Sequence, residues 1–160
     1  PVQPAASPTP PPPSRSKAEE DPPFCLGSQS QGEEQTLASL MDLVKEGVFI
    51  AQALVRRGGS CSRSLSCLAA DHRRALRQLS AAYFLITGQR YRPPNPSVVL
   101  NASLPLALRD QFVWEQRWER ANQQAAETTS DACLKELYQE LAQDGVLHAA
   151  TIRSLLEQMG

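Results

Sequence analysis

Four stretches of this sequence carry apolar residues at spacings that alternate between three and four positions, and this repeat constrains the fold most. The stretches cover residues 33–57, 64–87, 105–128 and 131–159. Such a spacing places one stripe of side chains along one face of a helix, and that stripe must be buried against other helices. The strict alternation that indicates β-strands is missing from the sequence. We therefore predict an all-α fold.

Residues that end or begin helices separate these stretches. Gly58 and Gly59 follow the first stretch, and Gly88 follows the second. Pro105 begins the third, where a proline suits the first helical turn. Because short connections favour antiparallel neighbours, we expect an antiparallel four-helix bundle in which the longer connection over residues 88–104 joins two helical hairpins.

The first 32 residues differ in composition from the rest. Nine of the 13 prolines lie within residues 1–23, among many Ser and Gln residues. Such a segment buries too little apolar surface to offset the entropy of ordering it. We predict a disordered Pro-rich tail over residues 1–32 and a bundle over residues 33–160. The tail could dock on a proline-binding protein partner through residues 10–13, although a plain tether is the simpler role.

Charge and hydropathy exclude several classes of partner. Lys and Arg number 16 against 17 Asp and Glu, for a net charge of -1, which argues against a nucleic-acid surface. No apolar run approaches the roughly 18 residues of a membrane span. The chain does not open with the basic and then apolar residues of a signal peptide. We expect a soluble, cytoplasmic protein that contacts neither nucleic acid nor membrane.

The cysteines match no metal or redox motif. Cys61 and Cys67 form the closest pair, and their spacing fits neither a zinc site nor a CxxC motif. Cys25 and Cys133 lie far from both. We expect all four to be thiols in a reducing compartment.

The apolar stripes are interrupted near the middle of each helix. The interrupting residues are histidines, one acid and glycines. The two histidines, His72 and His148, both fall on stripes, as does Glu115. Gly47 and Gly145 do so too, although a glycine inside a helix costs about 1 kcal/mol relative to alanine. The pattern has single positions on the first helix (47) and the third (115). It has pairs of positions three residues apart on the second helix (72 and 75) and the fourth (145 and 148). It is the ligand layout of carboxylate-bridged di-iron bundles.

Two short segments add a resemblance to a known family. They are LSAAYFLITG at residues 79–88, which closes the second stretch, and CLKELY at residues 133–138, which opens the fourth. Together with the layout, they resemble small bacterial ferritin-like proteins of the rubrerythrin-like group over residues 33–159. This resemblance implies a ferritin-like four-helix bundle with a di-iron centre.

The resemblance also implies a degenerate centre. The family pattern places Glu at 47 and 115 and Glu-x-x-His at 72–75 and 145–148. At these positions the chain has Gly47, His72, Ala75, Glu115, Gly145 and His148. Two of the six expected ligands, Glu115 and His148, remain. At position 72 the family has a carboxylate, and this chain has the imidazole of His72 instead. Glu46 could replace the missing ligand of the first helix if the register shifts by one residue.

Three interpretations follow. In the first, Glu115 is a buried acid paired with one or both histidines, the core around the glycines is loosely packed or wet, and the bundle is a non-catalytic structural or interaction protein. In the second, His72, Glu115 and His148, with Glu46 as a fourth, bind a single iron or zinc ion. In the third, an iron-dependent oxidoreductase centre is intact. We expect the first, without cofactor, and retain iron binding as the alternative.

The third helix also carries both tryptophans, four residues apart. Trp118 falls on the stripe, so we expect it in the core. Trp114 lies beside the stripe and could serve a homodimer contact through helix faces, in the way that ferritin-like domains often pair.

Overall fold

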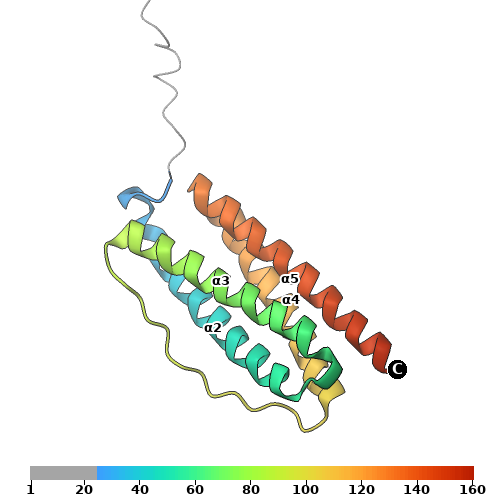
Figure 1. Cartoon of the computed structure of the whole chain (residues 1–160). Coiled ribbons are helices and arrows are strands. Elements are labelled where there is room, and N and C mark those ends of the chain that lie inside the picture. Colours follow the sequence, from blue (N-terminus) through green and yellow to red (C-terminus); the bar gives the residue numbers. More distant parts are fainter. Residues whose placement is uncertain (1–24) are drawn as a thin grey trace, which may run out of the picture.

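The computed structural model describes residues 25–160, which form four long helices (Figure 1). The helices are α2 (Glu34–Arg57), α3 (Ser62–Thr87), α4 (Leu104–Thr128) and α5 (Ala132–Met159). Two short 3-10 helices, η1 (Ser28–Glu33) and η2 (Gly59–Cys61), precede α2 and α3. Within residues 25–160 there are no strands, and no helix has the length and hydropathy to span a membrane. The predicted all-α fold is confirmed, with helix bounds within two residues of those expected.

The helix ends have local causes that the sequence already contained. Gly88 ends α3 in the left-handed region, at φ 73°, which glycine adopts at little cost. Ser103 accepts a hydrogen bond from the backbone N–H of Leu106 at the start of α4, and Asp131 accepts one from Leu134 at the start of α5. Each cap satisfies a donor that the first helical turn leaves free.

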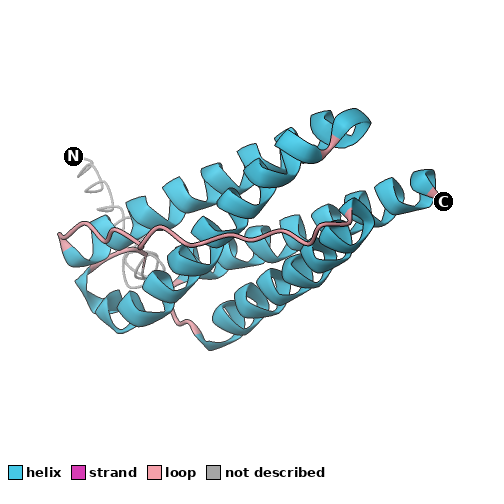
Figure 2. Cartoon of the chain, turned by 90° about the horizontal axis from the view of Figure 1, so that it is seen from below, coloured by secondary structure: helices cyan, strands magenta, loops and turns pink. Residues whose placement is uncertain are grey.

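The connection between α3 and α4 determines how the two hairpins combine. Residues 88–103 run along the length of the bundle beside α2 (Figures 1 and 2). Lys45 donates a hydrogen bond to the carbonyl of Pro93, and Arg57 donates to the carbonyls of Asn101 and Ala102. The chain thus returns to the end where α3 began. As a result α3 and α4 point the same way, and α2 with α3 and α4 with α5 form antiparallel pairs.

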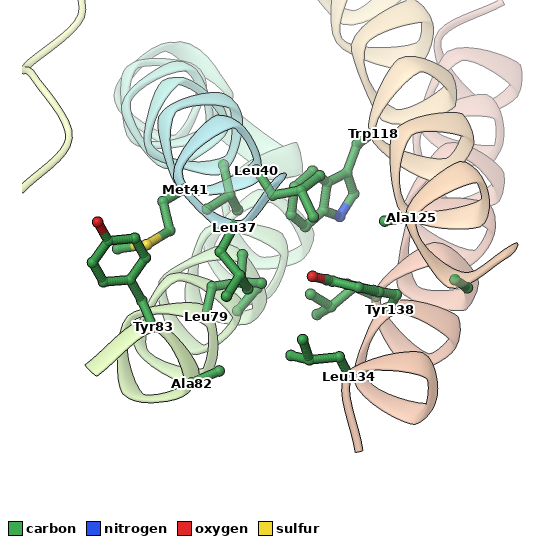
Figure 3. Packing of buried hydrophobic residues seen from close by; sticks show 14 of the residues in the cluster. Leu37, Leu40, Met41, Leu79, Ala82, Tyr83, Trp118, Ala125, Leu134 and Tyr138 are labelled. Carbon is green, nitrogen blue, oxygen red and sulfur yellow. The ribbon is translucent and has the colours of Figure 1, made fainter. Parts of the chain in front are cut away.

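The apolar stripes predicted from the sequence form the core between the hairpins (Figure 3). Trp118 and Tyr138 are its largest fully buried side chains. Within the four predicted stretches, every stripe position from Leu37 to Leu155 is buried. Met159 at the last turn of α5 is 41% exposed, because the helix there extends beyond its neighbours.

The described structure includes residues 25–32, which precede the predicted domain boundary at residue 33. A disulfide joins Cys25 to Cys133 at the start of α5. The carboxylate of Asp131 accepts hydrogen bonds from the Leu26 backbone and from the hydroxyl of buried Ser30. These contacts fix residues 25–32 against the bundle, so this part of the predicted tail is structured. The prediction for residues 1–24 lies outside the described residues.

The disulfide also corrects the prediction of four thiols. Cys61 and Cys67 are free, but Cys25 and Cys133 are not. Their separation of 108 residues hides the pairing from any search for short motifs, because only the fold brings them together. Although Asp131 lies close to both sulfur atoms, the disulfide leaves no thiolate there to bind a metal.

Candidate metal centre

His72, Glu115 and His148 meet at the middle of the bundle. They come from α3, α4 and α5, and their exposed fractions are 1%, 0% and 6%. Each occupies a stripe position where the helix periodicity directs a side chain inward. One donor atom from each lies within 4.8 Å of one from each of the others. The sequence pattern therefore selected three residues that the fold does bring together.

The Glu115 carboxylate is the hub of this cluster. Its Oε2 accepts hydrogen bonds from His72 Nε2 and from Gln111 Nε2, both at 2.7 Å. Its Oε1 accepts from His148 Nδ1 at 3.1 Å. A carboxylate that is completely buried requires such donors, since an unpaired one costs several kcal/mol.

Asp71 links the cluster to the protein surface. His148 Nε2 donates to Asp71 Oδ2 at 2.8 Å, and Asp71 also lies 3.4 Å from Arg74. The Asp71 side chain is 36% exposed. Asp71 was not among the residues singled out from the sequence, because neighbouring residues on a helix point about 100° apart and position 71 lies off the apolar stripe. Its position beside a stripe histidine was the available signal.

The charges of the cluster follow from these contacts. Burial raises the pKa of Glu115, but the hydrogen bonds and charges of His148 and His72 outweigh burial and leave this pKa below its ordinary value. Burial lowers the pKa of His148, but Glu115 and Asp71 outweigh it and leave this pKa above its ordinary value. Each ring nitrogen of His148 faces a carboxylate, an arrangement that favours the protonated ring when no metal is bound.

Two tryptophans form an apolar wall beside the cluster. The His72 ring meets the Trp114 ring edge-on, with centroids 5.1 Å apart, and it also lies edge-on to Trp118. Trp114 is only 5% exposed. The role suggested for Trp114 in a homodimer contact is therefore not supported, because its ring packs inside the bundle.

The glycines of the stripes allow close packing. A Cβ on Gly47 would lie only 2.6 Å from Cζ2 of Trp114. A Cβ on Gly145 would lie 3.1 Å from the Glu115 carbonyl oxygen and 3.2 Å from Glu119 Cα. The expectation of a loose core around these glycines is wrong, since an indole ring and the α4 backbone fill the two positions.

Glu46 does not join the cluster. It accepts a hydrogen bond from Trp114 Nε1 at 2.9 Å and lies 3.6 Å from Arg117. Its side chain is 38% exposed. Glu46 lies one residue before Gly47, the stripe position of α2. Its side chain points toward the edge of α4, where it holds the Trp114 indole that packs on Gly47.

The inner face of α4 also carries polar atoms without a partner. Within the described part of the chain, Gln111 Oε1, Trp118 Nε1 and Asn122 Oδ1 are buried and make no hydrogen bond. Gln111 is the important one here, because its amide already contacts Glu115 and its carbonyl oxygen is an additional hard donor atom beside the cluster.

Comparisons with protein-family models, with curated proteins and with solved structures found no match to this chain. The geometry of the cluster is therefore the basis on which a function can be inferred.

Proposed function

We propose that this protein binds one divalent transition-metal ion between α3, α4 and α5, through His72, Glu115 and His148. The supporting observation is the convergence of their donor atoms within 4.8 Å of one another in a fully buried site. Two imidazoles and one carboxylate form a recognised ligand set for a single Fe²⁺ or Zn²⁺ ion. A bound ion of this kind supplies Lewis acidity, and iron adds one-electron redox chemistry.

The surroundings of the three residues fit an ion. Histidine ligands usually donate their second ring N–H to a carboxylate, which orients the ring and raises its basicity. Asp71 is placed to do this for His148. The charges of Glu115 and Asp71 would together balance those of a divalent cation, and Gln111 holds the Glu115 carboxylate in place.

A di-iron pair does not fit these residues. Two iron ions need several carboxylates, and Glu115 is the only acid among the three converging side chains. The space at Gly47 is filled by Trp114, and that at Gly145 by the α4 backbone. The ferritin-like relationship itself stays part of the proposal. It is supported by the long connection between the hairpins, which ferritin-like bundles share.

One observation favours a second candidate, a non-catalytic bundle without metal. The Glu115 carboxylate already accepts three hydrogen bonds. In this case the cluster is a buried ionic network that specifies how the two hairpins pack, a use for which such networks are known.

Metal analysis separates the two candidates. We would incubate the purified chain with Fe²⁺ under anaerobic conditions and, separately, with Zn²⁺, and measure bound metal by mass spectrometry. Glu115→Gln is the test variant, and Glu46→Gln is the matched control because Glu46 lies outside the cluster. One ion per chain that is lost only in Glu115→Gln is expected. No bound ion would leave the bundle without metal, and two per chain would overturn the single-ion site.

We also infer the kind of cellular compartment in which the protein acts. The sequence predicts the cytoplasm, but disulfides persist mainly in oxidising compartments, so we infer from the Cys25–Cys133 bond that the protein acts in one. When the protein from its native source is unfolded without reductant, alkylation should label Cys61 and Cys67 but not Cys25 and Cys133. Labelling of all four cysteines would contradict this inference.

A further inference from the structure

A cavity on the α2–α3 hairpin shares no lining residue with the proposed metal centre. It has a volume of about 500 Å³ and is bounded by α2, by α3 and by the first residues of the long connection. This size lies within the range of small-molecule sites. Its floor includes the apolar side chains of Met41, Leu76 and Ala81.

The charged residues that line this cavity are all basic. They are Lys45 from α2, Arg77 from α3, and Arg90 and Arg92 from the connection. The whole chain has a net charge of -1, so this gathering of cations does not reflect a basic protein. It marks one local region of positive potential, which attracts anions.

Two of these cations have no internal role among the described residues. Lys45 donates to the Pro93 carbonyl, and Arg90 lies over the Phe84 ring at 4.6 Å. Arg77 and Arg92 are exposed and form no ion pair with any described acid.

Asp42, the residue after Met41 of the lining, is already engaged in a hydrogen bond. Asp42 accepts a hydrogen bond from the Tyr91 hydroxyl at 2.7 Å. That bond also holds the Tyr91 ring at the cavity wall. The two free guanidinium groups therefore stand beside apolar and aromatic surface.

We propose that this cavity binds a small amphiphilic anion. Its phosphate or carboxylate group pairs with Arg77 and Arg92, whose planar N–H groups match the oxygen geometry of such anions. Its apolar part covers Leu76, Ala81 and the ring of Tyr91. The site uses none of the proposed metal-binding residues, so a test of this site does not depend on the proposed function.

Calorimetry with three probes tests the ligand class. Octyl phosphate carries both features, inorganic phosphate only the charge, and octyl glucoside only the apolar chain; all are used below their micelle-forming concentration. We expect saturable binding of octyl phosphate at one site, at least tenfold tighter than either other probe. Equal binding of inorganic phosphate would overturn the apolar part of the assignment. Equal binding of octyl glucoside would overturn the anion part.

Paired variants test the location. Arg77→Gln with Arg92→Gln removes the two free cations of the cavity. The control is Arg56→Gln with Arg73→Gln, which removes the same charge from exposed positions of α2 and α3 outside this cavity. We expect octyl phosphate to bind about tenfold or more weakly to the first variant and unchanged to the control. An equal loss in both, or no loss in either, would overturn the site.

Discussion

At the scale of single residues, the contrast between Glu46 and Glu115 shows how one helical position decides a role. Glu115 lies on the buried stripe of α4 and contacts two histidines and a glutamine. Glu46 lies one residue off the stripe of α2 and contacts an indole N–H and an exposed arginine. Because one residue rotates a helix by about 100°, the two acids face different environments.

Asp71 provides the first prediction at this scale. Under the proposed metal binding, Asp71→Asn should lower zinc affinity by about 10- to 100-fold, because His148 loses the carboxylate that orients its ring. Asp110→Asn, an exposed acid of α4, is the control and should leave affinity unchanged. The measurement is competition with a fluorescent zinc chelator. Equal affinity in both variants would show that Asp71 only packs beside the site.

The buried glycines, Gly47 and Gly145, provide the second prediction at this scale. We expect Gly47→Ala and Gly145→Ala each to destabilise the protein by about 1–3 kcal/mol, because the added methyl group meets Trp114 or the α4 backbone. The gain in helix propensity, about 1 kcal/mol, offsets only part of this cost. Urea unfolding measures the effect. Gly32→Ala, whose Cβ would meet open space, is the control; a rise in stability for either helical variant would contradict the close packing.

At the scale of elements, the start of α5 is where the N-terminal segment joins the bundle. Asp131 caps α5 through Leu134 and also binds Leu26 and Ser30. The pKa of Asp131 is lowered, because the hydrogen bonds from Ser30 and from backbone N–H groups outweigh the effect of burial. One side chain therefore connects η1 with α5, beside the disulfide.

This double role predicts an unequal response at the two helix caps. Ser103 caps α4 and is exposed, and its hydroxyl makes no hydrogen bond to another described helix. Ser103→Ala should cost about 0.5–1 kcal/mol. Asp131→Ala should cost about 2–4 kcal/mol, since it also leaves the Leu26 N–H and the Ser30 hydroxyl without their acceptor. Thermal unfolding compares the two variants, and similar losses would show that η1 gains nothing from Asp131.

At the scale of the whole molecule, the buried cluster couples folding to pH. The carboxylates that act on His148 are Glu115, Asp71 and Asp144. The pKa of His148 is raised above its ordinary 6.5 in the folded protein. Its protonated form therefore contributes stability that is fully present below pH 6.5 and is lost as the pH rises through the folded pKa.

Metal binding should reverse this dependence. We expect the melting temperature of the metal-free protein to fall as the pH rises above about 6.5, with a smaller fall in Glu115→Gln, where His148 loses a charged partner. Stabilisation by added Zn²⁺ should instead grow with pH, because histidine must release its proton to bind a metal. Differential scanning fluorimetry from pH 5 to 9 measures both. A flat profile without metal would show that His148 stays neutral.

The sequence alone determined the helices and the buried face of each. Helix formation and amphipathic spacing are local properties, so positions such as Leu37, His72 and Trp118 could be placed in the core from their period alone. Only the tertiary structure decided which stripe residues touch. That Asp71 reaches His148, that Trp114 closes on Gly47 and that Cys25 meets Cys133 depend on how four helices rotate and slide against one another. Those adjustments are set by the packing of all side chains at once, and no local pattern records them.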